Sequence, residues 1–527
     1  MQRKLLSLLV LLMTTATGAW AQDPYAGGWC GDDVEYQLTD DGVMTIWKNN
    51  GSGAMEDYSS YEDQPWQSYR NKITSVVVEA GVTHIGKNSF NGLTNLNTVS
   101  LPEGLLTIGD MAFRECSSLG SITIPASVTS IGQYAFYACN KLTTVTFSAG
   151  SHLTSIGNDA FRECSSLTSI TIPDGVTSIK NHAFSGCSEL SSVSIPASVT
   201  TIGVNAFESC KKLTTVTFSE GSLLTTIGGS AFGHTALSSI DIPDGVTSIG
   251  ESAFSYFLDA GFAEITIPAS VTTIGRYAFY ACNKLTTVTF SAGSHLTSIG
   301  DHAFTACPNL ATVTFNSNPS IDTDAFPNGA TVTMNPTANA AGGAKWTTFY
   351  NQNYSFAADA NTEVFKVALS GTELTLNKVA NGIVDAGTAV VLKTTGDNPV
   401  MTKTTTASDD TQANNLMGVS AAAGVENNGT FYVLNNGSQG VGFYKMKSGK
   451  TVGVGKAYLK YTAGAREFFD FDETTSISEE LRVKSEEFLC EQARATTAPV
   501  YDLQGRRVSQ PTKGLYIVNG KKVFINK

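Results

Sequence analysis

The sequence is poor in charged side chains, which make up 15% of its 527 residues, against about 25% in a typical soluble domain. It has only six histidines, and it contains no His-Glu-x-x-His, Cys-x-x-Cys or Gly-x-Ser-x-Gly pattern. The usual sequence signs of a zinc protease, a redox dithiol and a serine hydrolase are therefore missing. We expect a protein that is not an enzyme and that uses no cofactor and no metal.

Positive charge is scarce as well. Lysine and arginine number 34 against 46 acidic residues, so the net charge is −12, and it becomes −14 once Arg3 and Lys4 are removed. A phosphate backbone would be repelled by such a chain as a whole. We therefore expect no nucleic-acid partner.

Long apolar runs are absent except at the start of the chain. There, Arg3 and Lys4 precede an apolar run from Leu5 to Met13, and Ala19-Trp20-Ala21 follows. This order of basic, apolar and small residues is typical of a secretory signal peptide, here residues 1–21, cleaved after Ala21. We expect a mature chain without a membrane span that is secreted or held at the cell surface.

What the sequence does have is a repeat built around Ala-Phe. The phenylalanine returns every 22 to 25 residues, a period that is typical of leucine-rich repeats. One such unit is too small to bury its apolar face alone and becomes stable only when stacked on its neighbours. We therefore expect a β-rich leucine-rich-repeat solenoid of about 11 coils. The repeat phenylalanines are Phe90, Phe113, Phe136, Phe161, Phe184, Phe207, Phe232, Phe254, Phe279, Phe304 and Phe326.

Each unit contains two extended stretches. In the unit around Phe136, Leu142, Val145 and Phe147 follow an L-x-x-V-x-F spacing, whose last three residues alternate as in a short strand. A second extended stretch, 128–131, ends at Gly132, where a turn is expected. Residues 123–161 and 266–304 are nearly identical in sequence, which indicates duplication of a block.

Changes in composition divide the rest of the chain. Before the repeats, Val34–Leu38 and Val43–Trp47 flank Asp40-Asp41-Gly42 and predict a hairpin in an amino-terminal cap. After them, short β-prone runs such as 389–392 and 430–434 predict an all-β sandwich-like domain, followed by a small β tail. The expected divisions are a signal peptide (1–21), a β cap (22–72), the solenoid (73–334), a linker (335–345), the all-β domain (346–472), a second linker (473–498) and the β tail (499–527).

An aromatic loop joins the cap to the first coil. It runs from Tyr58 to Trp66. Such a loop could bind a partner, or it could fold over the open end of the solenoid, which would otherwise expose its core to water. We favour the second interpretation.

Cysteines are concentrated in the repeats. Seven of the nine lie three residues after a repeat phenylalanine, whereas Cys30 and Cys490 lie outside the array. A parallel ladder spreads such side chains along an axis, which suits neither a disulfide nor a zinc site. We expect the seven thiols to be buried as small apolar groups.

The coil sequence, Ile-Pro-x-x-Val-Thr-x-Ile-Gly-x-x-Ala-Phe-x-x-Cys-x-x-Leu-Thr, resembles the BspA-like leucine-rich repeats of bacterial surface proteins over about residues 73–334. Residues 346–472 resemble a β domain that trails repeats in exported proteins of Bacteroidetes. Residues 501–508 and 513–518 are similar to the carboxy-terminal sorting domains of type IX secretion. The resemblance implies an adhesin-like protein that binds host matrix, glycans or other bacteria.

Two surfaces of the solenoid are candidates for binding. The outward positions of the strands carry Ser and Thr, which either suit a solvated β face or offer many weak hydrogen bonds to an elongated partner. Another edge, beside the Ala-Phe turn, carries the residue types that dominate interface hot spots. The candidate partner-binding residues on that edge are Tyr134, Tyr137, Tyr277, Tyr280, Arg114, Arg162 and Arg276.

Three functions remain open. We favour an exported monomer whose repeats bind an extracellular protein or glycan. One alternative is an architectural spacer. The other is a glycan-active enzyme in residues 346–472, although Glu363, Glu373 and Asp385 lie in no motif that pairs two carboxylates.

Overall fold

The computed structural model describes residues 25–257, most of residues 261–470 and four short strands between residues 500 and 525. The chain forms two compact units, one of residues 1–367 with 377–469 and the other of residues 368–376 with 470–527. The expected signal peptide and second linker, with Cys490, lie outside the described residues. Within 261–470 the gaps are 318, 323, 328–329, 336–338, 342–343, 371–372, 397, 409–413, 415, 419–424, 427–430, 438–439, 447–449, 453–456 and 461–467.

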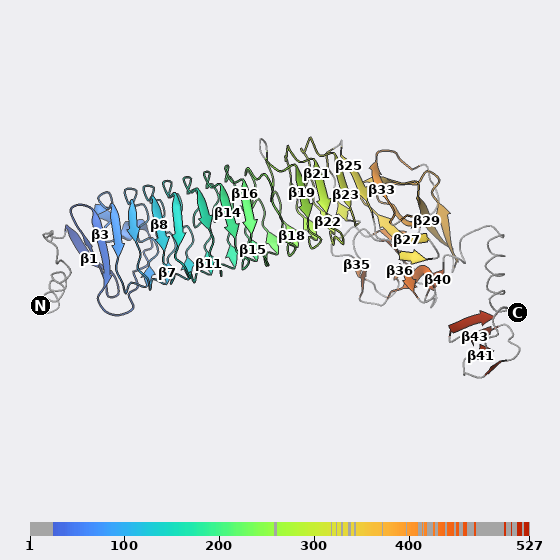
Figure 1. Cartoon of the computed structure of the whole chain (residues 1–527), viewed down its shortest axis with the longest axis horizontal. Helices are drawn as coiled ribbons and strands as arrows, with labels where there is room; N and C mark the ends of the chain where they lie inside the picture. The colour runs from blue at the N-terminus through green and yellow to red at the C-terminus, as the bar shows by residue number, and fades with distance from the viewer. Residues whose placement is uncertain are drawn as a thin grey trace. The chain divides into compact units, whose positions relative to one another are not determined.

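The repeats form a β-solenoid, as expected (Figure 1). Each coil contributes a strand of two residues to one parallel ladder of 11 strands, and this number agrees with the predicted number of coils. The first residue of each strand is Ser, Thr or, in β5, His, and it pairs with the first residue of the neighbouring strand, while each Ile pairs with Ile. The strands are β5 (His84–Ile85), β7 (Thr107–Ile108), β9 (Ser130–Ile131), β11 (Ser155–Ile156), β13 (Ser178–Ile179), β15 (Thr201–Ile202), β17 (Thr226–Ile227), β18 (Ser248–Ile249), β20 (Thr273–Ile274), β22 (Ser298–Ile299) and β24 (Ser320–Ile321).

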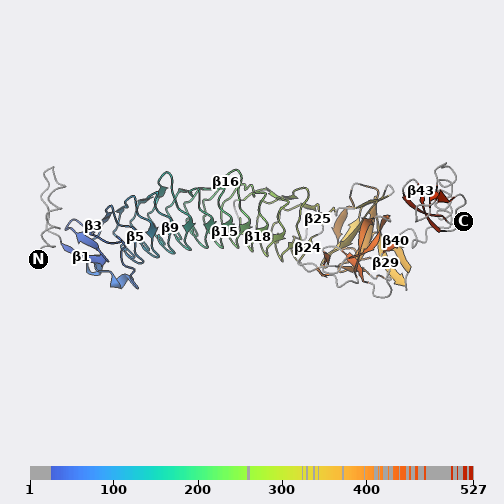
Figure 2. The same cartoon turned by 90° about the horizontal axis from the view of Figure 1, so that it is seen from below.

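Longer strands form the second face of the solenoid. They too pair in parallel, and alternate residues are buried because side chains on a strand point to opposite faces. Figure 2 shows the coils in a row from the perpendicular direction. The strands are β4 (Ser75–Val78), β6 (Thr98–Ser100), β8 (Ser121–Ile124), β10 (Thr144–Phe147), β12 (Ser169–Thr171), β14 (Ser192–Ile195), β16 (Thr215–Phe218), β19 (Glu264–Ile267), β21 (Thr287–Phe290), β23 (Thr312–Phe315) and β25 (Thr331–Met334).

The long strands do not form one continuous sheet: the pairing stops between β6 and β8 and again between β16 and β19, where residues 239–242 form no strand. Two changes of length coincide there. In most coils a leucine follows the repeat phenylalanine by six residues, whereas Leu237 follows Phe232 by five and Phe262 follows Phe254 by eight. The larger Phe262 packs edge-on against Phe254 in place of that leucine. A shortened coil beside a lengthened one shifts the backbone out of ladder register.

The core is a continuous stack of the repeat phenylalanines. From Phe90 to Phe326 successive rings lie 4.9–5.6 Å apart, with interplanar angles of 1–26°. The rings are at most 4% exposed. Coils of variable length share this core because the stacked position is the same in each.

A row of free thiols runs beside the phenylalanine stack. Each of the seven repeat cysteines is buried, and its Sγ donates a hydrogen bond of 3.1–3.2 Å to the carbonyl of the phenylalanine in the preceding coil. Burial raises the pKa of Cys187 and Cys210 above that of an ordinary thiol. The predicted row of buried thiols is therefore confirmed.

The amino-terminal cap contains the predicted hairpin. Strands β2 (Val34–Leu38) and β3 (Val43–Lys48) pair antiparallel, and β1 (Ala26–Gly31) adds to β2. β3 then pairs in parallel with β4, so the cap sheet continues into the first coils. Two 3-10 turns, η1 (Tyr61–Asp63) and η2 (Gln67–Tyr69), lie in and after the aromatic loop.

The aromatic loop folds over the first coil, as favoured above. Trp66 is fully buried, and its ring stacks on Phe90 at 5.7 Å. Tyr36 and Tyr58 contact the other sides of the Trp66 ring in T-shaped arrangements, at 5.0 and 6.0 Å. Trp66 therefore ends the phenylalanine stack and keeps water from it.

The opposite end of the solenoid continues into further β-sheets. β25 pairs antiparallel with β33 (Met401–Thr404), and β28 (Ser355–Ala358) and β31 (Ile383–Val384) extend the same sheet. Residues 335–345, expected to be a linker, include β26 (Asn339–Ala341), which pairs with β27 (Ala344–Tyr350). The buried apolar core runs without a break from Cys30 to Met401.

The remaining strands confirm the β-rich carboxy-terminal region, including the predicted run 389–392 and residues 431–434 of the run predicted at 430–434. β27 pairs with β32 (Ala389–Thr394), which pairs with β29 (Thr362–Ser370), and β30 (Glu373–Lys378) follows along the chain. Further strands are β34 (Leu416–Gly418), β35 (Val425–Glu426), β36 (Phe431–Gly437), β37 (Gly440–Lys445), β38 (Thr451–Val452), β39 (Ala457–Lys460) and β40 (Phe468–Asp470).

The smaller unit contains a four-stranded sheet in the order β42-β41-β43-β44. Its strands are β41 (Val500–Tyr501), β42 (Arg507–Val508), β43 (Gly514–Val518) and β44 (Lys521–Ile525). β43 and β44 form the antiparallel pair on either side of Asn519-Gly520. In the part of the chain that the structure describes, no helix has the length and hydropathy needed to cross a bilayer.

Candidate binding edge of the solenoid

The third edge of each coil is held by backbone hydrogen bonds to the next coil. Around Phe136, the amides of Tyr134, Phe136 and Ala138 donate to carbonyls of the following coil at 2.8–2.9 Å. The two residues that flank the phenylalanine in this set have positive φ, 56° for both Tyr134 and Ala138. Because the backbone conformation alternates in this way, the N–H group of every second residue points along the solenoid axis toward the next coil. The side chains that flank the phenylalanine are left outside the core.

The left-handed positions recur from coil to coil, and most of them are not glycine. A left-handed conformation costs an L-residue about 1 kcal/mol, and small or Asn-like residues tolerate it best. Asp159, Asn205 and Gly186 occupy such positions, but so do bulky rings. We call the side chains from three residues before to two residues after each repeat phenylalanine the Ala-Phe edge. The rings at left-handed positions on it are Tyr134, His182, His234, Tyr256, Tyr277 and His302.

All seven candidate partner-binding residues lie on this edge, in two clusters. The first cluster centres on Tyr137. The guanidinium carbons of Arg114 and Arg162 lie 5.3 and 5.9 Å from the centre of its ring, and Tyr134 makes a T-shaped contact at 5.7 Å. The Tyr137 hydroxyl donates a 3.1 Å hydrogen bond to Glu163. Burial and this hydrogen bond raise the pKa of Tyr137.

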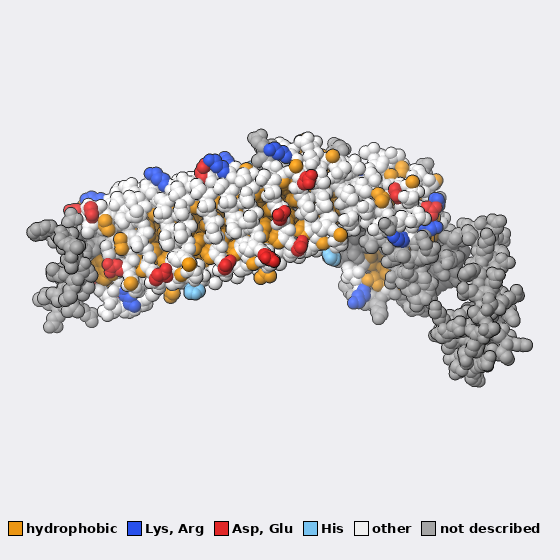
Figure 3. Space-filling model, viewed as in Figure 1, with side chains coloured by type: hydrophobic (Ala, Val, Ile, Leu, Met, Phe, Trp, Pro, Cys, Tyr) orange, Lys and Arg blue, Asp and Glu red, His pale blue; other side chains and the backbone are white. Residues whose placement is uncertain are grey.

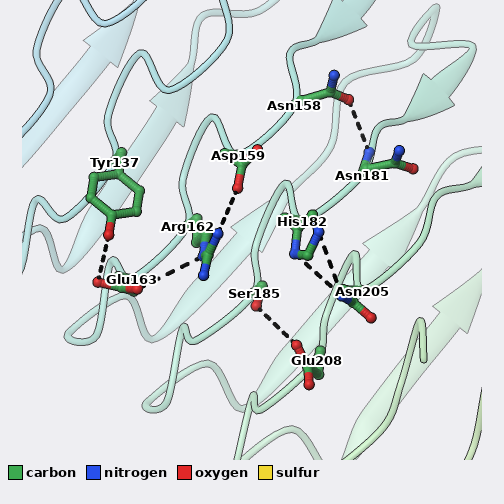
Figure 4. A network of polar contacts seen from close by, with 10 residues as sticks. All are labelled: Tyr137, Asn158, Asp159, Arg162, Glu163, Asn181, His182, Ser185, Asn205 and Glu208. Atoms are coloured by element: carbon green, nitrogen blue, oxygen red, sulfur yellow. Dashed lines mark hydrogen bonds and ion pairs between the residues drawn. The ribbon is translucent and has the colours of Figure 1, made fainter. Parts of the chain in front are cut away.

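Carboxylates pair with both arginines of the first cluster, and Figure 4 shows the contacts of Arg162 with Asp159 and Glu163. Arg162 donates to Asp159 at 3.1 Å and lies 3.7 Å from Glu163, and Arg114 lies 2.6 Å from Glu115. The Asp159 side chain is only 7% exposed, and Arg162 is the cation that pairs with this buried carboxylate. The first cluster therefore satisfies most of its own charges and ring faces.

The second cluster centres on Tyr277 and Tyr280. The Arg276 guanidinium lies 4.5 Å from the centre of the Tyr277 ring and donates a 3.0 Å hydrogen bond to its hydroxyl. Arg276 also lies 3.4 Å from Asp301. Tyr280 contacts Tyr277 in a T-shaped arrangement at 5.3 Å.

Three aromatic residues of the second cluster were missed in the sequence. Tyr256 lies 5.4 Å from Tyr280, His234 stacks on Tyr256 at 4.5 Å with parallel rings, and His302 lies 5.1 Å from Tyr277. The sequence contains one signal for them, since each lies two residues before or after a repeat phenylalanine. That signal is weak because the equivalent residues in the coils around the first copy are not aromatic: they are Glu115, Gly92 and Asp159.

The long-strand face offers a different, uncharged surface. Outward residues such as Thr144 and Thr146 are exposed, as predicted. The residue before several of the long strands also carries a hydroxyl, and this hydroxyl joins adjacent coils. Thr143 donates a 3.0 Å hydrogen bond to the Gly120 carbonyl of the preceding coil, and the equivalent residues of other coils make the same bond. In the view of Figure 3 most of the solenoid surface is uncharged, with Lys and Arg gathered along one rim and Asp and Glu mainly along the other.

These arrangements suit noncovalent recognition. The described residues hold no group of three or more His, Cys, Asp or Glu side chains placed to bind a metal ion. The Ala-Phe edge combines carboxylates with tyrosine rings and guanidinium groups, and Tyr and Arg are among the residue types that are enriched at interface hot spots.

Comparison with known proteins identifies the repeat. Residues 67–152, 147–260 and 255–356 match the model of the BspA type leucine rich repeat region (6 copies), and together they span more than half of the chain. This is a repeat family and not a catalytic one. No curated protein matches the chain significantly.

Several solved structures are similar in part. A leucine-rich repeat protein from Bacteroides ovatus is 25% identical, with a TM-score of 0.40, and the match covers 58% of this chain and 88% of that one. A T. pallidum leucine rich repeat protein is 28% identical, with a TM-score of 0.27, over 34% and 88%. A leucine rich cell surface protein from Faecalibacterium prausnitzii is 23% identical, with a TM-score of 0.25, over 55% and 95%.

Proposed function

The chain belongs to the BspA-type leucine-rich repeat family, and from this premise we propose that it is an exported binding protein of the cell surface or the secreted fraction. Its Ala-Phe edge binds an extracellular protein or glycan. The signal peptide expected at residues 1–21 supplies the route out of the cytoplasm. The type IX-like tail and an origin in Bacteroidetes belong to the same proposal.

One observation carries this proposal. Bulky rings occupy left-handed positions of the Ala-Phe edge that other coils fill with non-aromatic residues, most of them Ala, Ser, Asp, Asn, Glu or Gly. Because a ring there has a backbone cost and adds no core contact, its presence favours a role at the surface. Arg114, Arg162 and Arg276 lie in contact with these rings or with Tyr137.

The test is binding of the full exported chain to panels of matrix proteins and glycans. We expect saturable binding that is lost when Tyr277, Tyr280 and Arg276 are changed to Ala together. Thr144→Ala with Thr146→Ala is the matched control, since these residues lie on the exposed strand face. Binding that survives the first variant and disappears in the control would move the function to the strand face.

A spacer function is the second candidate, and the first cluster favours it. There, rings, arginines and carboxylates satisfy one another, so this part of the edge gains nothing from a partner. Cells that express the chain without residues 73–334 should adhere less than cells with the full chain. Equal adhesion would support the spacer.

The contacts of Glu363 give no support to a glycan-active enzyme. Lys378 donates a 2.6 Å hydrogen bond to its carboxylate, and this bond lowers the pKa of Glu363, to which Lys393 at 3.4 Å also contributes. A general acid for glycoside cleavage needs a raised pKa instead. Asp385 accepts a 2.7 Å hydrogen bond from the Ser408 amide.

A further inference from the structure

The duplicated blocks contain the same tyrosine in two different settings. Tyr137 and Tyr280 occupy equivalent places, one residue after the repeat phenylalanine, within nearly identical sequence. Both are partly exposed. Any difference between their surroundings must come from the coils on either side.

Tyr137 has two cations of its own chain close to its ring. Arg114 and Arg162 lie 5.3 and 5.9 Å from the ring centre, within the range of a cation–π contact. In the second copy the positions equivalent to these arginines hold Ser255 and Thr305. Among the residues that the structure describes, no Lys or Arg lies over the ring of Tyr280.

In the second copy, Tyr280 has an aromatic neighbour, whereas Tyr137 in the first copy has two arginines. Tyr256 replaces the equivalent of Glu115, is 40% exposed and lies 5.4 Å from Tyr280 with the rings inclined at 68°. His234, stacked in parallel on Tyr256, supports one side of that ring. The exposed ring of Tyr256 and the partly exposed ring of Tyr280 are therefore steeply inclined neighbours that solvent can reach.

The charges around these rings favour a cationic guest. Glu251 and Asp301 occupy the position three residues before the repeat phenylalanine in the coils on either side of Arg276. Arg276 lies over Tyr277 and is paired with Asp301, so it is already engaged. The chain as a whole is acidic, with a net charge of −12, which attracts basic partners.

We propose that Tyr256 and Tyr280 bind the guanidinium or ammonium group of a basic side chain on a protein partner. The guest cation takes the place that Arg114 and Arg162 fill beside Tyr137. The faces of both rings are negative and attract it, while the acidic surroundings steer it. This inference rests on the proposed binding function and assigns to it a basic protein segment as the partner.

The experiment uses the full exported chain and a fluorescent arginine-rich peptide as probe. The same peptide with citrulline in place of arginine keeps the planar shape and removes the charge. We expect the arginine peptide to bind more tightly, and we expect its affinity to fall with added salt. Tyr280→Ala and Tyr256→Ala should each weaken it about two- to fivefold, the range that corresponds to an exposed cation–π contact. Tyr280→Phe should retain binding because it keeps the ring.

Tyr137→Ala is the matched comparison at the equivalent place, and it should weaken peptide binding less than Tyr280→Ala does, because the chain's own arginines occupy the Tyr137 ring. Thr305→Arg, which introduces a residue at the place equivalent to Arg162, should reduce binding by covering Tyr280. Thermal melts establish that each variant is folded. This second variant removes no contact of the ring pair, so it tests the inference even if an alanine variant is unstable.

Three outcomes would overturn the inference. These are equal binding of the citrulline peptide, equal losses in Tyr137→Ala and Tyr280→Ala, and displacement of the peptide by dextran, which would indicate a neutral glycan site. If the arginine-rich peptide does not bind while the chain still binds a matrix protein, the proposed binding function stands and only the assignment to Tyr256 and Tyr280 is wrong.

Discussion

The two copies of the duplicated block show how the same coil can serve different purposes. In residues 123–161 and 266–304 the phenylalanine stack, the thiol row and the strand ladders are the same. Their Ala-Phe edges differ, since Tyr137 is surrounded by arginines and carboxylates whereas Tyr280 is surrounded by rings.

The difference between the conserved core and the divergent edge indicates which residues the fold constrains. A residue inside the stack contacts its equivalents in two neighbouring coils, so a change at one coil disturbs three. A residue on the edge is surrounded by side chains that can change separately, and Arg162 and Thr305 occupy equivalent places. Duplication therefore preserves the core and allows the surface to diverge.

The largest expected effect comes from alkaline pH, which acts on the thiol row. The thiols of Cys187 and Cys210 have raised pKa values because they are buried, and burial raises the pKa of Cys30 in the cap to about 12. Above pH 9 the unfolded chain loses thiol protons that the folded chain keeps, so stability falls as pH rises. Each such thiol contributes about 1.4 kcal/mol per pH unit.

Thermal melts between pH 8 and pH 11 measure this effect. Cys187→Ala should make the fall in Tm with pH less steep, because one shifted thiol is removed. A Tm that stays constant up to pH 11 would contradict the burial of the thiols.

The next effect tests whether the two copies share one core. Phe136→Ala and Phe279→Ala should each lower the free energy of unfolding by about 3–5 kcal/mol, since each leaves a large cavity in the stack. Urea denaturation measures the loss, and hydrogen exchange shows whether it is confined to neighbouring coils. If the losses in the free energy of unfolding for the two variants differ by more than about 2 kcal/mol, the packing around Phe136 and around Phe279 is not equivalent.

A smaller effect separates the two edges. Arg162→Ala should cost about 1–3 kcal/mol because it leaves the buried carboxylate of Asp159 without its cation. At the equivalent place, Thr305→Ala removes only a neutral hydrogen bond from the Thr305 hydroxyl to the Asp324 carbonyl and should cost less, about 0.5 kcal/mol. Equal losses in urea denaturation would show that the pairing of Arg162 is not a special feature of the first copy.

The smallest effect concerns a feature that both copies retain. Ala138 and Ala281 have a φ of 56° in equivalent positions. Changing either to Gly should stabilise the chain by up to about 1 kcal/mol, because glycine adopts this conformation without a steric cost. Calorimetry should give the same rise in Tm for both, and a fall in both would mean that the backbone is not strained there.

Much of the fold could be predicted because the period of the repeat phenylalanine is visible in the sequence. The hairpin around Gly42 and the burial of Trp66 over the first coil also followed from local pattern and from the need to cover an open core. The pairing of β25 with β33 could not be predicted, because it joins residues about 70 positions apart without a shared motif.

The candidate site was predictable only in part. The residues of the Ala-Phe edge could be named, since their types and their phase relative to phenylalanine are visible. Which of them pair with one another could not, because Arg162 reaches Asp159 in its own coil while Tyr137 reaches Glu163 in the next. The left-handed positions were hidden as well, since glycine, the usual marker, is rare there.

The coil-to-coil hydrogen bonds of the Ala-Phe edge have a consequence for how such genes change. From the coil of Phe90 to the coil of Phe279, each coil donates to its successor through the same three amides, so these coils can follow one another in a different order without a new type of junction. Crossing-over between the two copied segments would excise six coils in phase. Descendants of this gene are therefore expected to differ in the length of the solenoid by whole coils, while the amino-terminal cap and the carboxy-terminal β-sheets are retained.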